Sequence, residues 1–78
     1  MIINSLFSSY IYSTREENKL TQEKMAEILD VSVRWYQNFE NGTALPNCKS
    51  ICILVKRFGC DLEVLLKEVS FEDLLYAE

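Results

Sequence analysis

Residues 20–42, LTQEKMAEILDVSVRWYQNFENG, decide the fold because they encode two short helices separated by a tight turn. Thr21 is a residue type suited to a helix N-cap, and a helically spaced apolar stripe follows it. Because Ala26 is small, a second helix can cross the first closely at this position. The stripe that we expect to be buried consists of Met25, Ala26, Ile28 and Leu29.

The turn and the second helix follow directly. Asp30 tolerates the left-handed backbone that a sharp turn can demand, and Val31 is placed to fill the angle between the helices. Ser32 is expected to cap the second helix, in which Tyr36 and Phe39 are three residues apart and face inward. The segment therefore predicts two crossed helices with a shared core.

The opposite face of the second helix is polar and carries no acidic residue. Arginine can bind guanine with two hydrogen bonds, asparagine and glutamine can do the same with adenine, and valine can contact a thymine methyl group. The face therefore has the side-chain types that recognition of DNA base edges requires. It consists of Val33, Arg34, Gln37, Asn38 and Asn41.

The order of these residues resembles the lambda-repressor-like helix-turn-helix family, also called Cro/CI or XRE. The likeness extends from roughly Ile11 to Leu66, about two thirds of the chain. It implies an all-α fold, a compact bundle of about five helices. The residues that carry it are Thr21-Gln22, Met25-Ala26, Asp30-Val31-Ser32, Tyr36, Phe39-Glu40, and Gly42 with Pro46 four residues later.

The resemblance also implies roles for individual residues. Arg15 and Glu40 would form a partly buried ion pair that locks the first helix to the recognition helix. Lys49 lies in the first turn of a later helix, where it could contact a phosphate or equally be a solvated lysine. The residues expected to contact base edges are Val33, Arg34, Gln37 and Asn38. Those expected to contact phosphates are Gln22, Ser32, Asn41, Thr43 and Lys49.

Three positions depart from the family pattern. Lys19 and Asp30 lie at turns where the family often has glycine or asparagine. Trp35 occupies a site that usually holds a small residue, so it could cover the bundle, pack on sugar and phosphate, or mark a protein contact. The recognition helix has one basic side chain, which predicts weak nonspecific affinity for DNA.

Length and composition suit one small helical domain. The chain has 78 residues, of which 49% are hydrophobic, and it has a single proline. We expect one domain over residues 1–78, with a core over about 4–67 and a C-terminal extension over 68–78. The longest strong apolar run is Ile51 to Val55, so no membrane span is expected. The N-terminus lacks the pattern of a signal peptide, which favours a cytoplasmic protein.

The net charge of −4 is distributed unevenly. Residues 1–59 carry seven basic and six acidic side chains, whereas residues 60–78 carry one and six. Between Val31 and Arg57, four basic residues accompany the single acid Glu40. DNA responds to the electrostatic field of the surface that it approaches and not to the net charge of the chain. An acidic tail therefore does not exclude a nucleic-acid interface elsewhere.

Cys48, Cys52 and Cys60 lack a fourth ligand for zinc, and the sequence contains no histidine. We expect no metal and no cofactor, and we expect Cys48 and Cys52 to pack in the core beside Ile51 and Val55. The absence of histidine also removes the usual general base, and no glycine-rich phosphate loop exists. The sequence therefore argues against an enzyme and against a small-molecule substrate.

The remaining segments predict scaffold helices. A first helix over about Asn4 to Asn18 buries Leu6, Phe7, Tyr10, Ile11 and Thr14, and a later helix runs from about Asn47 to Phe58 with Gly59 as a left-handed cap. Asp61 and then Ser70 to Asp73 give two further capping signals, each before apolar residues. These apolar residues either close the core or form a two-fold dimer contact. They are Leu62, Leu65, Leu66 and Val69, then Leu74, Leu75 and Tyr76.

Two functional hypotheses follow. The first is a sequence-specific DNA-binding regulator of transcription, by resemblance a homodimeric repressor of phage or mobile-element type on a palindromic operator in double-stranded DNA. The second is a protein-interaction module, such as an anti-repressor or antitoxin component, that uses Trp35 and the tail. Binding to DNA should weaken steeply as salt rises, whereas an apolar contact should respond little.

Overall fold

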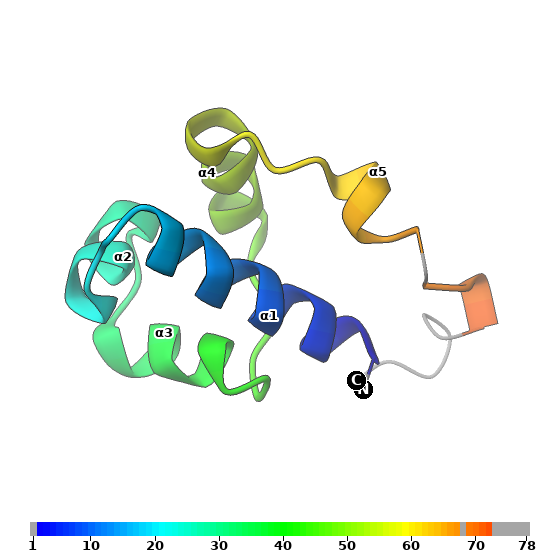
Figure 1. The fold of residues 1–78 in the computed structure, drawn as a ribbon. Coiled ribbons are helices and arrows are strands. Elements are labelled where there is room, and N and C mark those ends of the chain that lie inside the picture. The colour runs from blue at the N-terminus through cyan, green and yellow to red at the C-terminus, as the bar shows by residue number, and fades with distance from the viewer. Residues whose placement is uncertain (1, 68, 73–78) are drawn as a thin grey trace.

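Figure 1 shows the computed structural model of the chain, in which residues 2–67 and 69–72 are described. Five helices follow one another, and this described part contains no strand, which confirms the all-α prediction. The helices are α1 (Ile2–Glu17), α2 (Gln22–Leu29), α3 (Val33–Glu40), α4 (Cys48–Phe58) and α5 (Leu62–Leu65).

Four of the helices begin at a side chain that caps the first turn. Each cap oxygen accepts a hydrogen bond from the backbone N–H three residues later, which satisfies a group that the helix itself cannot pair. The predicted caps at Thr21, Ser32 and Asp61 are confirmed. The acceptor–donor pairs are Thr21–Lys24 at 3.0 Å, Ser32–Trp35 at 3.1 Å, Asn47–Ser50 at 2.8 Å and Asp61–Val64 at 3.2 Å.

Two helices end at a non-glycine residue in the left-handed conformation. Lys19 has φ 55° after α1, and Asp30 has φ 59° after α2. At the end of α2 the N–H of Val31 returns to the carbonyl of Ala26 at 3.0 Å, which closes the turn. The turns that lack the family's usual glycine or asparagine therefore still adopt left-handed geometry.

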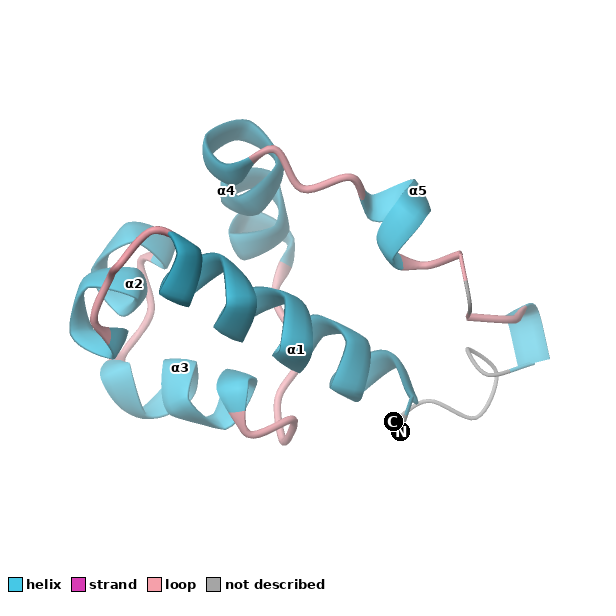
Figure 2. Ribbon diagram, viewed as in Figure 1, coloured by secondary structure: helices cyan, strands magenta, loops and turns pink. Residues whose placement is uncertain are grey.

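The core lies where α1, α2 and α3 meet, with α4 packed against α2 (Figure 2). The apolar residues predicted for α2 and α3 are inside, although Ile28 is only partly covered. From α1, Phe7, Ile11 and Thr14 are buried, whereas Leu6 and Tyr10 are half-buried. The buried hydrophobic residues are Phe7, Ile11, Met25, Ala26, Leu29, Tyr36, Phe39, Leu54 and Cys60.

The prediction that Cys48 and Cys52 pack in the core is wrong. Both thiols are exposed, as is Val55, while Ser50 and Leu54 are buried on the inner face of α4. At about 3.6 residues per turn, Ser50 and Leu54 share one face, and the two cysteines with Val55 share the opposite face. Contact with α2 selects the first of these faces.

The C-terminal segment is partly packed and partly exposed. Leu62, Leu65 and Leu66 lie half-buried against the core, whereas Val64 and Phe71 are 67% and 73% exposed. The predicted residues Asp73, Leu74, Leu75 and Tyr76 lie outside the described residues. None of the helices in the described ranges is long and apolar enough to cross a membrane.

Candidate nucleic-acid interface

The outer face of α3 is open to solvent. All four predicted base-contacting residues are exposed, and they come from a helix whose other side is fixed in the core by Tyr36 and Phe39. Arg34 has no ion-pair partner among residues 2–67 and 69–72, so its guanidinium group is available to a ligand. The four residues are Val33, Arg34, Gln37 and Asn38.

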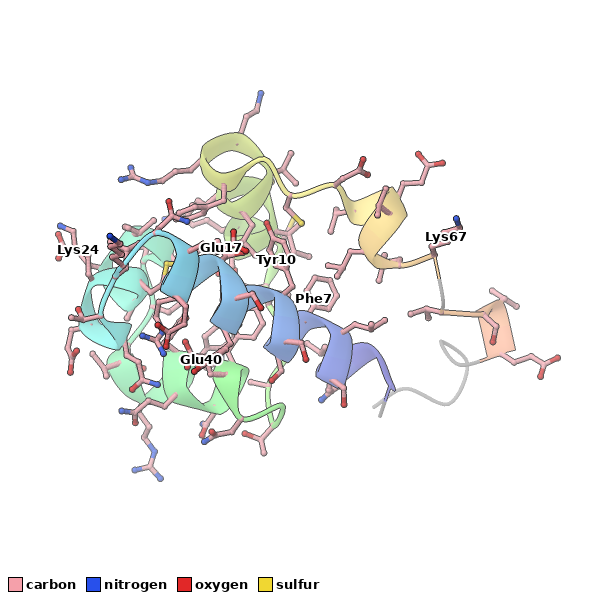
Figure 3. All side chains as sticks on the ribbon, in the orientation of Figure 1. Phe7, Tyr10, Glu17, Lys24, Glu40 and Lys67 are labelled. Carbon is pink, nitrogen blue, oxygen red and sulfur yellow. The ribbon has the colours of Figure 1, made fainter. Side chains whose placement is uncertain are left out.

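An ion pair joins α1 to the last turn of α3. Arg15 Nε donates to Glu40 Oε2 at 2.5 Å, and its second terminal nitrogen reaches Glu40 Oε1 at 3.2 Å. The two side chains are only 14% and 6% exposed. Figure 3 shows Glu40 between the two helices. Because the fork of hydrogen bonds is directional, the pair fixes the orientation of α3 as well as its distance from α1.

The hydroxyl of Tyr36 also donates to Glu40. Burial raises the pKa of Tyr36 well above its ordinary value, and the hydrogen bond to the carboxylate raises it further, so the phenol stays a donor. Sequence reasoning placed Tyr36 in the core and missed this bond. The spacing of four residues between Tyr36 and Glu40 could have predicted it, because residues four apart on a helix are neighbours.

The carboxyl group of Glu40 is held in its charged form. Burial alone would raise its pKa, but hydrogen bonds from Arg15, Tyr36 and Gln22 outweigh burial and lower the pKa below its ordinary value of 4.5. Glu40 is thus a buried anion whose neighbours come from three helices.

Gln22 connects this anion to the exposed face of α3. Its Nε2 donates to Glu40 Oε1 at 3.1 Å, and its Oε1 accepts from Gln37 Nε2 at 3.3 Å. Glu40 accepts only, so it determines which end of the Gln22 amide faces Gln37. One N–H and the oxygen of Gln37 then remain available, which is the pair of groups that adenine binds.

The residues predicted to contact phosphates lie around the two ends of α3, and several already have partners in the protein. Ser32 caps α3, and Thr43 Oγ1 donates to the carbonyl of Asn38 at 3.1 Å. Lys49 Nζ lies 2.5 Å from Asp30 Oδ2, with both side chains exposed. Water and salt screen an exposed pair of this kind, so a phosphate could compete for Lys49.

Comparison with known protein families shows which family this chain belongs to. A family model described as helix-turn-helix matches residues 11–65, which is more than half of the chain. The chain belongs to the lambda-repressor-like, or XRE, helix-turn-helix family. This is a family of DNA-binding regulators of transcription and not a family of enzymes. Comparisons with curated proteins and with solved structures gave no significant match.

Trp35, whose role the sequence left open, lies beside Phe39 on α3. Its indole is half-buried against the core, and its ring lies edge-on to Phe39 with 5.6 Å between ring centroids. The ring covers part of the bundle and stays partly exposed, so a contact with sugar and phosphate or with a protein remains a prediction. The aromatic contact adds to the burial of the inner face of α3.

Proposed function

We propose that this XRE-family regulator recognises a specific operator by placing α3 in the major groove of double-stranded DNA. One observation carries the proposal. The outer face of α3 is exposed and free of acidic residues, while its inner side and its last turn are fixed by the core and by Glu40. A rigid helix with a free polar face meets the geometric requirement for contacts to base edges.

In this proposal residues on and around α3 have different roles in recognition. Arg34 binds a guanine, Gln37 and Asn38 bind adenines, and Val33 contacts a thymine methyl group. Gln22, Ser32, Asn41, Thr43 and Lys49 contact the flanking phosphates and set the orientation of the helix on the duplex.

We further propose that the protein acts as a homodimer, represses transcription, and works in the cytoplasm on a palindromic operator, in the manner of a phage or mobile-element repressor. The exposed side chains of Val64 and Phe71 support a contact between two copies near the C-terminus. Two recognition helices related by a two-fold axis would contact half-sites about one helical turn apart.

Selection of bound sequences from a random duplex library by the purified protein tests this function. The expected result is one enriched motif that contains guanine and adenine and has two inverted halves about 10 base pairs apart, centre to centre. Enrichment of a single half-site would support DNA recognition but contradict the proposed homodimer. Absence of any enriched motif would overturn the proposed function.

Salt dependence separates this function from a protein-interaction module. Because Lys49 is the one cation among the proposed phosphate contacts, a dimer would neutralise about two phosphates, and the affinity should fall by about tenfold between 50 and 200 mM salt. If a cellular partner bound through apolar contacts with little dependence on salt, and no duplex bound, the interaction module would be the better description.

A further inference from the structure

The first two turns of α1 lie before the region that matches the family. The match begins at residue 11, whereas α1 begins at Ile2. Phe7 from these turns is 4% exposed and belongs to the core, and Figure 3 shows it on the side of α1 that faces α5. These turns are therefore packed onto the bundle and do not project from it.

The same turns supply two hydrogen bonds to the C-terminal end of the recognition helix. Ser8 Oγ donates to the backbone carbonyl of Glu40 at 2.5 Å, and Asn4 Nδ2 donates to the carbonyl of Gly42 at 3.0 Å. A Cβ atom built on Gly42 would lie 3.9 Å from the Cβ of Ser8, so the turn passes close to α1.

The bond from Ser8 completes the end of α3. An α-helix leaves its last four carbonyls without a partner inside the helix. Those of Gln37, Asn38 and Phe39 accept from the N–H groups of residues 41, 43 and 42, at 2.9 to 3.2 Å. The fourth, on Glu40, accepts from Ser8.

Asn4, Ser8 and Arg15 lie along one side of α1 at helical spacing, and all three bind the end of α3. Arg15 holds the side chain of Glu40, Ser8 holds its carbonyl, and Asn4 holds the turn that follows. One end of α3 is thus fixed by the turn from α2, and the other end is fixed by α1.

We propose that Asn4 and Ser8 are positioning residues for base recognition, which set the tilt of α3 without touching DNA. This inference rests on the proposed function. Asn38 lies five residues after Val33, so a tilt of about 10° about the α2–α3 turn would displace it by about 1 Å. Specific contacts tolerate errors of about 0.5 Å, so the loss should be largest at the base that Asn38 contacts and smallest at the base that Val33 contacts.

The test compares the double variant Asn4→Ala/Ser8→Ala with the control Ser9→Ala/Ser13→Ala, whose serines are exposed on the same helix. Because alanine favours helix at all four positions, loss of helix propensity cannot explain a difference. The first readout needs no DNA. Amide hydrogen exchange in the free double variant should increase at the end of α3 and in residues 41–43, and should change little in α2 and α4. Faster exchange throughout the chain, or nowhere, would overturn the proposal.

The second readout is the ratio of affinities for the selected operator and its single-base variants. A partly unfolded sample lowers all affinities equally, so this ratio responds only to geometry. Discrimination should fall by about tenfold at the Asn38 position and stay within about twofold at the Val33 position. Equal discrimination by both double variants would overturn the inference and leave the proposed function standing. If the wild type selects no motif, the proposed function fails, and the exchange measurement alone decides whether Asn4 and Ser8 hold α3.

Discussion

Single residues at the helix ends decide how sharply this small chain turns. Lys19 ends α1 with φ 55°, a conformation that costs a residue with a Cβ about 1 to 2 kcal/mol. The turn is nevertheless closed, because the N–H of Leu20 reaches the carbonyl of Arg15 at 3.1 Å. The hydrogen bonds and packing around the turn therefore offset a local strain.

Replacing Lys19 with glycine should relieve that strain. We expect Lys19→Gly to raise the free energy of unfolding by about 0.5 to 1 kcal/mol, after allowance for the greater freedom of glycine in the unfolded chain. Chemical denaturation measures the change. Lys19→Ala is the control and should give no gain, so an equal gain from alanine would rule out strain as the cause.

Gln22 also acts at this scale, because its amide links Glu40 to Gln37. We expect Gln22→Met to reduce the preference for adenine at the Gln37 position by about 1 kcal/mol, since Gln37 loses the partner that orients it. Competition binding with single-base variants of the operator measures this preference. Thr43→Val, which removes a proposed phosphate contact, should lower the affinity equally for all operator variants. The same uniform loss of affinity from Gln22→Met would show that Gln22 contributes only a phosphate contact.

At the scale of elements, the bundle depends on how α1 and α3 are joined. The carboxylate of Glu40 is buried and accepts hydrogen bonds from Arg15, Tyr36 and Gln22, and these lower its pKa. A lowered pKa in the folded state means that protonation favours unfolding. The contribution of this carboxylate to stability is complete above its ordinary pKa of 4.5 and is lost as the pH falls through the lowered value.

Glu40→Gln should therefore cost about 3 kcal/mol at pH 7, because it leaves the Arg15 charge buried without its counterion. The variant should also lose less stability than the wild type when the pH falls below 4.5. Denaturation at a series of pH values checks both effects. Glu16→Gln is the matched control, because Glu16 is exposed and lies 3.9 Å from the same arginine. Parallel pH curves for wild type and Glu40→Gln would contradict this account.

Element positions were predictable wherever local chemistry decides them. The caps at Thr21, Ser32 and Asp61, and the left-handed end at Gly59, depend on residues close in sequence and are present as predicted. The inward face of α4 was not predictable in this way. Cys52 and Val55 are more apolar than Ser50, and only the contact with α2 shows that Leu54 and Ser50 face inward.

Parts of the site were accessible from sequence and parts were not. The exposed face of α3 follows from its helical period, since Tyr36 and Phe39 are buried and Arg34 and Asn38 are opposite them. The link from Glu40 through Gln22 joins residues 18 apart in sequence, and the bond from Asn4 to Gly42 spans 38 residues. No local pattern indicates such contacts, so they were visible only in the folded chain.

At the scale of the whole molecule, charge and apolar exposure are separated. The outer face of α3 carries Arg34 and no acid, whereas Asp61 and Glu63 accompany the exposed Val64 near the C-terminus. This separation suits a protein that binds DNA at one end and a second copy at the other. An acidic C-terminal end would be repelled by phosphate, which favours one orientation on the duplex.

If Val64 belongs to the proposed dimer contact, Val64→Glu should shift the protein towards the monomer and weaken operator binding by at least tenfold. The stability of the monomer should change by less than about 0.5 kcal/mol, because Val64 is exposed. Sedimentation equilibrium over a range of concentrations measures the shift. Glu63→Gln, at the exposed neighbouring position, should leave the association unchanged. If Val64→Glu also leaves it unchanged, this part of the chain is not the dimer interface.

Arg34→Ala tests most directly whether the outer face of α3 contacts base edges. The measurement is the affinity of wild type and variant for the selected operator and for every single-base change in it. We predict that Arg34→Ala loses about 1 to 3 kcal/mol of specific binding and no longer distinguishes guanine from the other bases at one position. A variant that keeps the wild-type pattern of discrimination at every position would contradict the assignment of α3 as the recognition helix.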